Sequence, residues 1–118
     1  MSDWIALRGI RASGRHGANP GERDHAQPFE IDLEIELDLD AARRSDTLAD
    51  TLDYAGVHAL IVETVAATSY ALLERLGDEI LNRVMADERV HSARLSLAKP
   101  RLLAGATPSV RLSARRDG

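Results

Sequence analysis

Lysine occurs once in this 118-residue sequence, at Lys99, whereas arginine occurs 14 times. Arginine can replace lysine on most surfaces, but it stays protonated and cannot transfer a proton. A chain that keeps a single amine among so many guanidinium groups therefore suggests proton-transfer chemistry at Lys99. The alternative is a compositional bias toward arginine, and the residue count leaves both interpretations open.

Three oxygen-bearing side chains are further candidates for chemistry, each with a simpler alternative. Glu74 falls near the start of an expected helix, where the helix dipole favours an ionised carboxylate, although most helical glutamates only face solvent. Tyr54 follows Asp53, a plausible N-cap of another helix, and a tyrosine there could serve packing alone. Glu22 occurs in the Gly- and Pro-containing stretch NPGER, where an exposed loop acid is the simplest interpretation.

Several classes of function are disfavoured by composition. There is no cysteine, so thiolate metal sites, disulfides and cysteine nucleophiles are excluded. The four histidines show no HxH or HxxxH spacing, and we expect no metal; they are His16, His25, His58 and His91. A net charge of -4 gives no attraction for nucleic acid. No apolar run approaches the ~20 residues of a membrane span, and the N-terminus lacks a signal peptide, so a cytoplasmic protein is expected.

Periodicity predicts one domain, over residues 1–118, with the element order ββααββ. Residues 29–40 alternate strictly between apolar and acidic side chains, which predicts a long half-buried strand. Residues 4–14 predict another strand, with a bulge at Gly9 where the alternation changes phase. Helical spacing follows Asp53 and again follows Ser69, and strands are expected at 90–99 and 109–115. This order predicts an α+β fold, a four-stranded antiparallel sheet with two helices on one face.

The face of the sheet away from the helices should carry charges of both signs. Residues 29–40 contribute an acidic row, and the last two strands contribute arginines. This pattern fits a solvated face, and it equally fits the hydrated inner wall of an oligomeric barrel. The two edges of such a sheet invite pairing between subunits.

Five segments in register resemble the dihydroneopterin aldolase family. They are LRGIRASGRHGANPGER (7–23), FEIDLEIELD (29–38), SDTLADTLDY (45–54), LLERLGDEI (72–80) and LAKP (97–100). The resemblance covers nearly the whole chain and implies the tunnelling fold, whose ββααββ order agrees with the periodicity. It also implies a ring-shaped homo-oligomer, a tetramer or an octamer of two rings, with active sites between subunits.

The resemblance assigns roles to residues at matching positions. It implies that Glu74 anchors a pterin through paired hydrogen bonds, that Lys99 performs general acid/base catalysis, and that Tyr54 manages protons from a neighbouring subunit. Glu22 would lie at the hydroxylated tail of the substrate. Three further positions would line the pterin pocket, namely Asp53, Leu73 and Ala18.

The implied activity is that of an aldehyde-lyase without a cofactor or metal. A base removes the proton of the 2′-hydroxyl of 7,8-dihydroneopterin, and the C1′–C2′ bond breaks to give 6-hydroxymethyl-7,8-dihydropterin and glycolaldehyde, a step of folate biosynthesis. One alternative is a 2′-epimerase of dihydroneopterin or its triphosphate, for which Arg23 and Arg101 are candidate tail contacts. Another is a non-catalytic pterin-binding ring protein.

Overall fold

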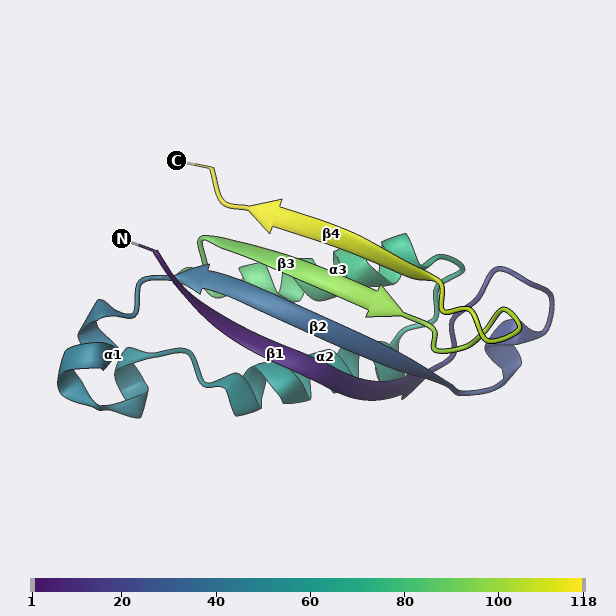
Figure 1. The fold of residues 1–118 in the computed structure, drawn as a ribbon, viewed down its shortest axis with the longest axis horizontal. Coiled ribbons are helices and arrows are strands. Elements are labelled where there is room, and N and C mark those ends of the chain that lie inside the picture. The colour runs from purple at the N-terminus through teal and green to yellow at the C-terminus, as the bar shows by residue number, and fades with distance from the viewer. Residues whose placement is uncertain (1, 118) are drawn as a thin grey trace.

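The computed structural model describes residues 2–117 as one sheet with helices on one side (Figure 1). The strands are β1 (Asp3–Gly14), β2 (Gln27–Leu37), β3 (Ser92–Ala98) and β4 (Ser109–Arg115). They pair antiparallel in the order β1-β2-β3-β4. The main helices are α2 (Tyr54–Ala67) and α3 (Leu73–Met85), and smaller elements are η1 (Glu22–Asp24), α1 (Asp40–Ser45) and η2 (Leu48–Asp50). The predicted α+β class is confirmed.

The predicted bulge in the first strand is confirmed. The register between β1 and β2 shifts between Leu7 and Ile10, and Gly9 adopts a φ of 70°. Glycine tolerates this left-handed conformation because it has no Cβ. Ile5 and Leu7 face the helices before the bulge, and Ile10 and Ala12 do so after it, so the extra residue keeps both halves of the strand in phase with the core.

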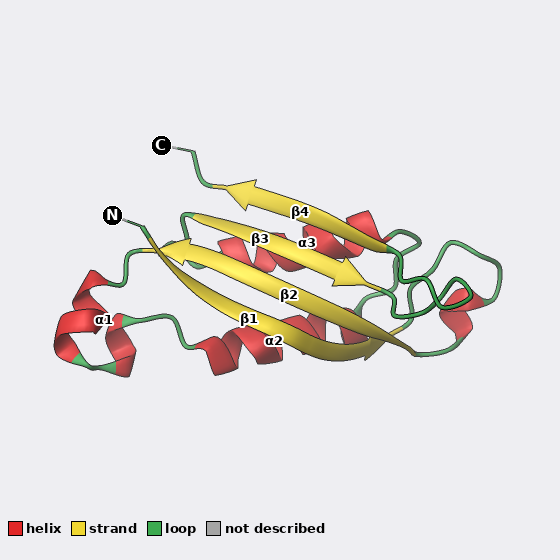
Figure 2. Cartoon of the chain, in the orientation of Figure 1, coloured by secondary structure: helices red, strands yellow, loops and turns green. Residues whose placement is uncertain are grey.

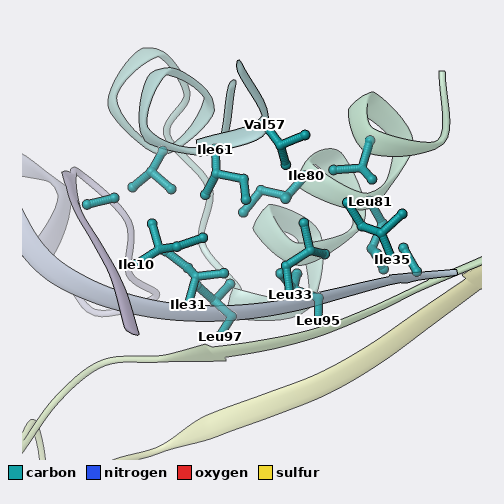
Figure 3. Close-up of a cluster of buried hydrophobic side chains, with 14 of the residues drawn as sticks. Ile10, Ile31, Leu33, Ile35, Val57, Ile61, Ile80, Leu81, Leu95 and Leu97 are labelled. Atoms are coloured by element: carbon teal, nitrogen blue, oxygen red, sulfur yellow. The ribbon is translucent and has the colours of Figure 1, made fainter. Parts of the chain in front are cut away.

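Both long helices cover the same face of the sheet and lie behind it in Figure 2. α2 packs against β1, and α3 packs against β3 and β4. The core between the sheet and the two helices is mostly aliphatic. Its side chains from β2 and β3 point toward those of the helices (Figure 3). A Cβ on Gly14 would lie 2.2 Å from the carbonyl oxygen of Val65, so this glycine permits close contact between the end of β1 and α2.

One strand boundary was predicted wrongly, and two short elements were not predicted. The alternation predicted a strand through Asp40, but β2 ends at Leu37, because the carboxylate of Asp38 accepts a hydrogen bond from the backbone N–H of Asp40 (2.8 Å) and turns the chain into α1. Neither α1 nor η2 was predicted. Residues 41–51, which hold most of both elements, are mainly polar and show no clear hydrophobic period, so patterning gave no signal for either element.

The face opposite the helices carries charged side chains, as expected. Arg8 pairs with Glu34 at 3.5 Å, and the backbone N–H of Gly9 donates to Asp32 at 2.7 Å. The guanidinium of Arg94 lies 4.9 Å from the centre of the Trp4 ring. Within residues 2–117, no helix has the length and apolar character needed to cross a bilayer.

Candidate active site

A cavity of about 260 Å³ opens where β3 ends, beside the start of α3. It brings together Glu22, Glu74 and Lys99, which come from three separate parts of the sequence. Two of the predicted pocket residues, Ala18 and Leu73, also line it. The other lining residues are mostly small or apolar, namely His16, Gly17, Asn19, Ala71, Leu72, Leu102, Leu103 and Pro108. The cavity therefore combines a mostly small or apolar lining with four ionisable side chains, those of His16, Glu22, Glu74 and Lys99.

Lys99 is buried at the inner end of this cavity, with 6% of its surface exposed. It follows the last residue of β3 and continues the inward phase of Leu95 and Leu97, as its position in the sequence predicted. Its ammonium donates hydrogen bonds to the carbonyl oxygen of His16 (2.8 Å) and to a carboxylate oxygen of Glu22. An ammonium has three N–H donors, and two of them pair with these residues. The third N–H has no partner among the described residues.

The ion pair with Glu22 depends on the loop after β1. Gly21 adopts a φ of 78°, which starts η1 at Glu22, and the backbone N–H of Asn19 donates to the Glu22 carboxylate at 3.2 Å. A Cβ on Gly17 would lie 2.0 Å from the Glu22 carboxyl carbon. Only glycine at position 17 leaves space for Glu22 to lie against Lys99.

The surroundings of Glu22 favour its ionised form. The hydrogen bond from Lys99 is the main cause that lowers the pKa of Glu22, and the backbone hydrogen bond at Asn19 adds to it, against a smaller opposing effect of burial. Glu22 therefore lies beside the Lys99 amine as a carboxylate at neutral pH. The resemblance placed Glu22 at the tail of the substrate, and this contact with Lys99 was not anticipated.

His16 is a site residue that the sequence analysis did not identify. Its side chain is almost completely buried, at 1% exposure, and its ring lies edge-on to Phe29 with centroids 5.4 Å apart. Burial is the largest cause that lowers its pKa, and the nearby charges of Lys99 and Arg23 act in the same direction. The one available signal was its position two residues after the first strand, and from the sequence it was a candidate only for metal ligation.

Glu74 lies at the mouth of the cavity, in the first turn of α3. Its side chain is exposed, and the helix dipole favours its negative charge there. A carboxylate that is exposed beside an apolar surface can accept two parallel hydrogen bonds from a planar ligand. Within residues 2–117, no three His, Asp or Glu side chains form a set of possible metal ligands.

Tyr54 and Asp53 do not line this cavity in the same chain. Asp53 is the N-cap of α2, as predicted, and accepts a hydrogen bond from the backbone N–H of Ala55 at 3.0 Å. Tyr54 is 62% exposed at the start of α2, whereas Val65 near its other end contacts His16. Eleven residues of helix separate the two, about 16 Å along its axis.

Comparison with known proteins identifies the family of the chain. The family model for dihydroneopterin aldolase matches residues 5–115. The chain is 35% identical to dihydroneopterin aldolase of Streptomyces coelicolor over 98 residues, covering 83% of this chain and 82% of that protein. It is also 35% identical to dihydroneopterin aldolase 2 of Arabidopsis thaliana over 101 residues, covering 85% and 77%.

The solved structures agree with the sequence relatives. The Escherichia coli dihydroneopterin aldolase in complex with neopterin superposes with a TM-score of 0.90 at 26% identity, covering 95% of this chain and 98% of that one. The match to the family model extends from β1 to the end of β4 and therefore includes every residue that lines the cavity. The chain belongs to the dihydroneopterin aldolase family.

Proposed function

We propose that the cavity around Glu22, Glu74 and Lys99 binds 7,8-dihydroneopterin and cleaves it to 6-hydroxymethyl-7,8-dihydropterin and glycolaldehyde. The observation that carries this proposal is that one cavity is lined both by the carboxyl group of Glu74 and by the buried ion pair of Lys99 and Glu22. The relatives are aldolases, and the E. coli structure was solved with neopterin bound, which supports a pterin as the ligand.

Glu74 is the proposed anchor of the pterin ring. A pterin presents an amino group and a ring N–H side by side, and one carboxylate can accept both hydrogen bonds. The apolar side chains of Leu72 and Leu73 border Glu74 in the cavity, where the flat faces of the ring can pack. Leu72 is 52% exposed, so part of this surface is free to receive a ligand or a neighbouring subunit.

Lys99 is the proposed proton-transfer group. The ammonium form holds a water or the 2′-hydroxyl through its remaining N–H, and the amine form accepts a proton from it. When the amine takes the hydroxyl proton, C2′ becomes the carbonyl carbon of glycolaldehyde, the C1′–C2′ bond breaks and its electrons enter the C6=N5 imine of the ring. Return of a proton to C1′ then restores the imine and gives the 6-hydroxymethyl product. Because the substrate accepts these electrons itself, the proposed reaction uses neither a metal nor a Schiff base.

Glu22 is proposed to act at the tail of the substrate and on Lys99 together. Its carboxylate lies against the ammonium, and it is placed to accept a hydrogen bond from a hydroxyl of the tail. Arg23 and Arg101 do not line the described cavity, and Arg23 instead donates to the carbonyl of Ser69 at 3.5 Å.

The complete site is proposed to lie between subunits of a cytoplasmic homo-oligomer. Tyr54 and Asp53 would reach the cavity from a neighbouring copy, since helix α2 separates them from the cavity of their own chain. The edge strands β1 and β4 offer unpaired backbone groups through which the sheets of several copies could join into a barrel, as a tetramer or a stacked octamer.

A product assay tests this function. Purified protein is incubated with 7,8-dihydroneopterin in the presence of a chelator, and glycolaldehyde and pterin products are measured. Equimolar glycolaldehyde and 6-hydroxymethyl-7,8-dihydropterin are expected. A pterin product of unchanged mass would instead identify an epimerase, and no conversion would contradict the proposal.

A further inference from the structure

The buried ring of His16 connects two segments of backbone that are remote in the sequence. Nδ1 accepts a hydrogen bond from the backbone N–H of Tyr70 at 3.0 Å, and Nε2 lies 2.9 Å from the carbonyl oxygen of Val65. Because a backbone amide can only donate, Nδ1 is unprotonated and Nε2 carries the hydrogen that Val65 accepts. Val65 is in the last turn of α2, where carbonyl groups have no partner within the helix.

Tyr70 is itself held firmly. Its hydroxyl donates to Glu79 of α3 at 3.1 Å, and the guanidinium of Arg75 lies 4.4 Å from the centre of its ring. Its carbonyl accepts a hydrogen bond from the backbone N–H of Gly17 at 3.0 Å. Tyr70 is therefore hydrogen-bonded both to the imidazole of His16 and to the backbone of the next residue. The backbone at His16 is therefore fixed to both helices.

The carbonyl of His16 points into the candidate site. It accepts a hydrogen bond from the Lys99 ammonium at 2.8 Å and another from the side-chain amide of Gln27 at 3.2 Å. Gln27 also donates to the carbonyl of Glu22 at 2.7 Å. The same carbonyl that the imidazole holds in place is thus one of the contacts that set the position of Lys99.

We propose that His16 is a positioning residue for Lys99, acting through its own carbonyl oxygen, which the buried imidazole fixes between Val65 and Tyr70. This inference rests on the proposed catalytic role of Lys99 and adds to it a residue that does not touch the substrate through its ring.

Protonation of the ring would break this arrangement. A doubly protonated imidazole would turn Nδ1 into a donor facing the N–H of Tyr70, which cannot accept. The charged groups that face His16 are the ammonium of Lys99 with its partner Glu22, and the guanidinium of Arg23, while uncharged Phe29 and Tyr70 rings close the remaining sides. Burial and these two cations oppose protonation of the ring.

Because Lys99 is the sole lysine, its position can be followed without measuring turnover. The rate at which an acylating reagent modifies the Lys99 amine is measured by peptide mass spectrometry in wild type, His16→Phe, His16→Asn and His16→Gln. Phenylalanine keeps an aromatic ring, although a larger one, and removes both ring contacts. Asparagine can retain the bond to Tyr70, and glutamine can reach the carbonyl of Val65.

For His16→Phe, we expect Lys99 acylation to accelerate severalfold and kcat to fall about 10- to 100-fold with KM nearly unchanged, because a small displacement of a catalytic group is costly. The asparagine and glutamine variants should recover part of both effects. The inference is overturned if Lys99 acylation and kcat in folded His16→Phe match wild type.

Loss of stability alone is controlled by Thr64→Val. Thr64 is fully buried on α2 and donates to the carbonyl of Leu60 at 2.6 Å, so this variant should be destabilised while Lys99 acylation and kcat remain as in wild type. Equal effects of Thr64→Val and His16→Phe, at matched folded fraction, would contradict positioning. If wild type fails to cleave dihydroneopterin, the proposed function fails, but the acylation result still decides whether His16 holds Lys99.

Discussion

Glu22 and Lys99 form an ion pair across 77 positions of sequence, at the inner end of the candidate site. Their side chains are 14% and 7% exposed, so the pair is largely removed from solvent. A buried charge without its partner is costly, which couples the two residues in stability as well as in chemistry. A change at either one should therefore alter both the pH dependence and the turnover of the protein.

Replacing Lys99 by methionine should abolish turnover while preserving the pterin site. Removal of a general acid/base group lowers kcat by about 100- to 10,000-fold. Binding of the product pterin, followed by fluorescence, should stay within a few-fold of wild type, because Glu74 is unchanged. Lys99→Arg is the matched control for charge: it can keep a cation beside Glu22, but it cannot release a proton, so it should be equally inactive. Activity in Lys99→Arg would remove proton transfer by Lys99 from the mechanism.

Glu22 should make folding stability depend on pH in the acidic range. The Lys99 hydrogen bond holds the pKa of Glu22 below its ordinary value of 4.5, so the unfolded chain takes up this proton at a higher pH than the folded chain. The stabilisation is thus complete above about pH 4.5 and is lost as the pH falls below it.

The free energy of unfolding is measured by urea denaturation between about pH 3 and pH 7, a range that brackets the titration of a carboxyl group. The stability difference between wild type and Glu22→Gln should shrink as the pH falls through the acidic part of that range. In a Lys99→Met background the pH dependence of this difference should largely disappear. A pH-independent difference in both backgrounds would show that the ion pair does not contribute.

Gly17→Ala should displace Glu22 from Lys99. The new Cβ would lie 2.0 Å from the Glu22 carboxyl carbon and 2.2 Å from one of its oxygens, so the carboxylate must move. We expect a loss of about 1–3 kcal/mol in the free energy of unfolding, and a lower kcat. Gly56→Ala is the contrasting variant, because its Cβ would come no closer than 3.9 Å to Asp53 and alanine favours the helix, so its melting temperature should rise. An unperturbed Gly17→Ala enzyme would contradict the described loop geometry.

Much of the fold follows from residue patterning in the sequence. Alternation in residues 29–37 and the phase change at Gly9 predicted β2 and the bulge of β1, because one face of each strand must meet the helices. The same patterning failed at Asp38, Leu39 and Asp40. There the alternation of apolar and acidic side chains continues, but local hydrogen bonds end the strand: Asp40 donates to Asp38, and the N–H of Leu39 donates to Asp3 at 3.2 Å.

The candidate site was predictable only in part. The phase of Lys99 along its strand indicated its burial, and the position of Glu74 indicated the first turn of a helix. The contact between Lys99 and Glu22 depends on how residues 15–26 fold back over the end of the sheet, which patterning does not describe. His16 escaped notice because its ring acts through hydrogen bonds to the backbone of Val65 and Tyr70, and backbone partners leave no signature in the sequence.

Glu74→Gln should weaken pterin binding without destabilising the fold. Glutamine offers one acceptor oxygen and an amide that repels a facing N–H, so one of two charge-assisted hydrogen bonds is lost. A hydrogen bond to a charged group of about 1.5–3 kcal/mol corresponds to a Kd about 10- to 100-fold higher. Glu63→Gln, an exposed position on α2, is the matched control and should bind as wild type does. Equal Kd values for the two variants would exclude Glu74 as the anchor.

A mixed oligomer of two inactive variants tests whether Tyr54 and Lys99 of one site come from different subunits. Tyr54→Phe and Lys99→Met are co-expressed with different tags, and oligomers that carry both tags are isolated. Suppose that each site joins Lys99 of one copy to Tyr54 of the next, through a heterologous interface that repeats around the ring. Random mixing then leaves both side chains intact in about a quarter of the sites, because each of the two copies must be the variant that keeps the needed residue.

Mixed oligomers should therefore regain activity that neither variant shows alone. If both residues of a site belonged to the same chain, every site would lack one of them and activity would stay at the level of the single variants. The separation of Tyr54 from its own cavity by the length of α2 favours recovery. A sample in which the two variants are mixed only after assembly, without exchange of subunits, controls for simple addition and should remain inactive.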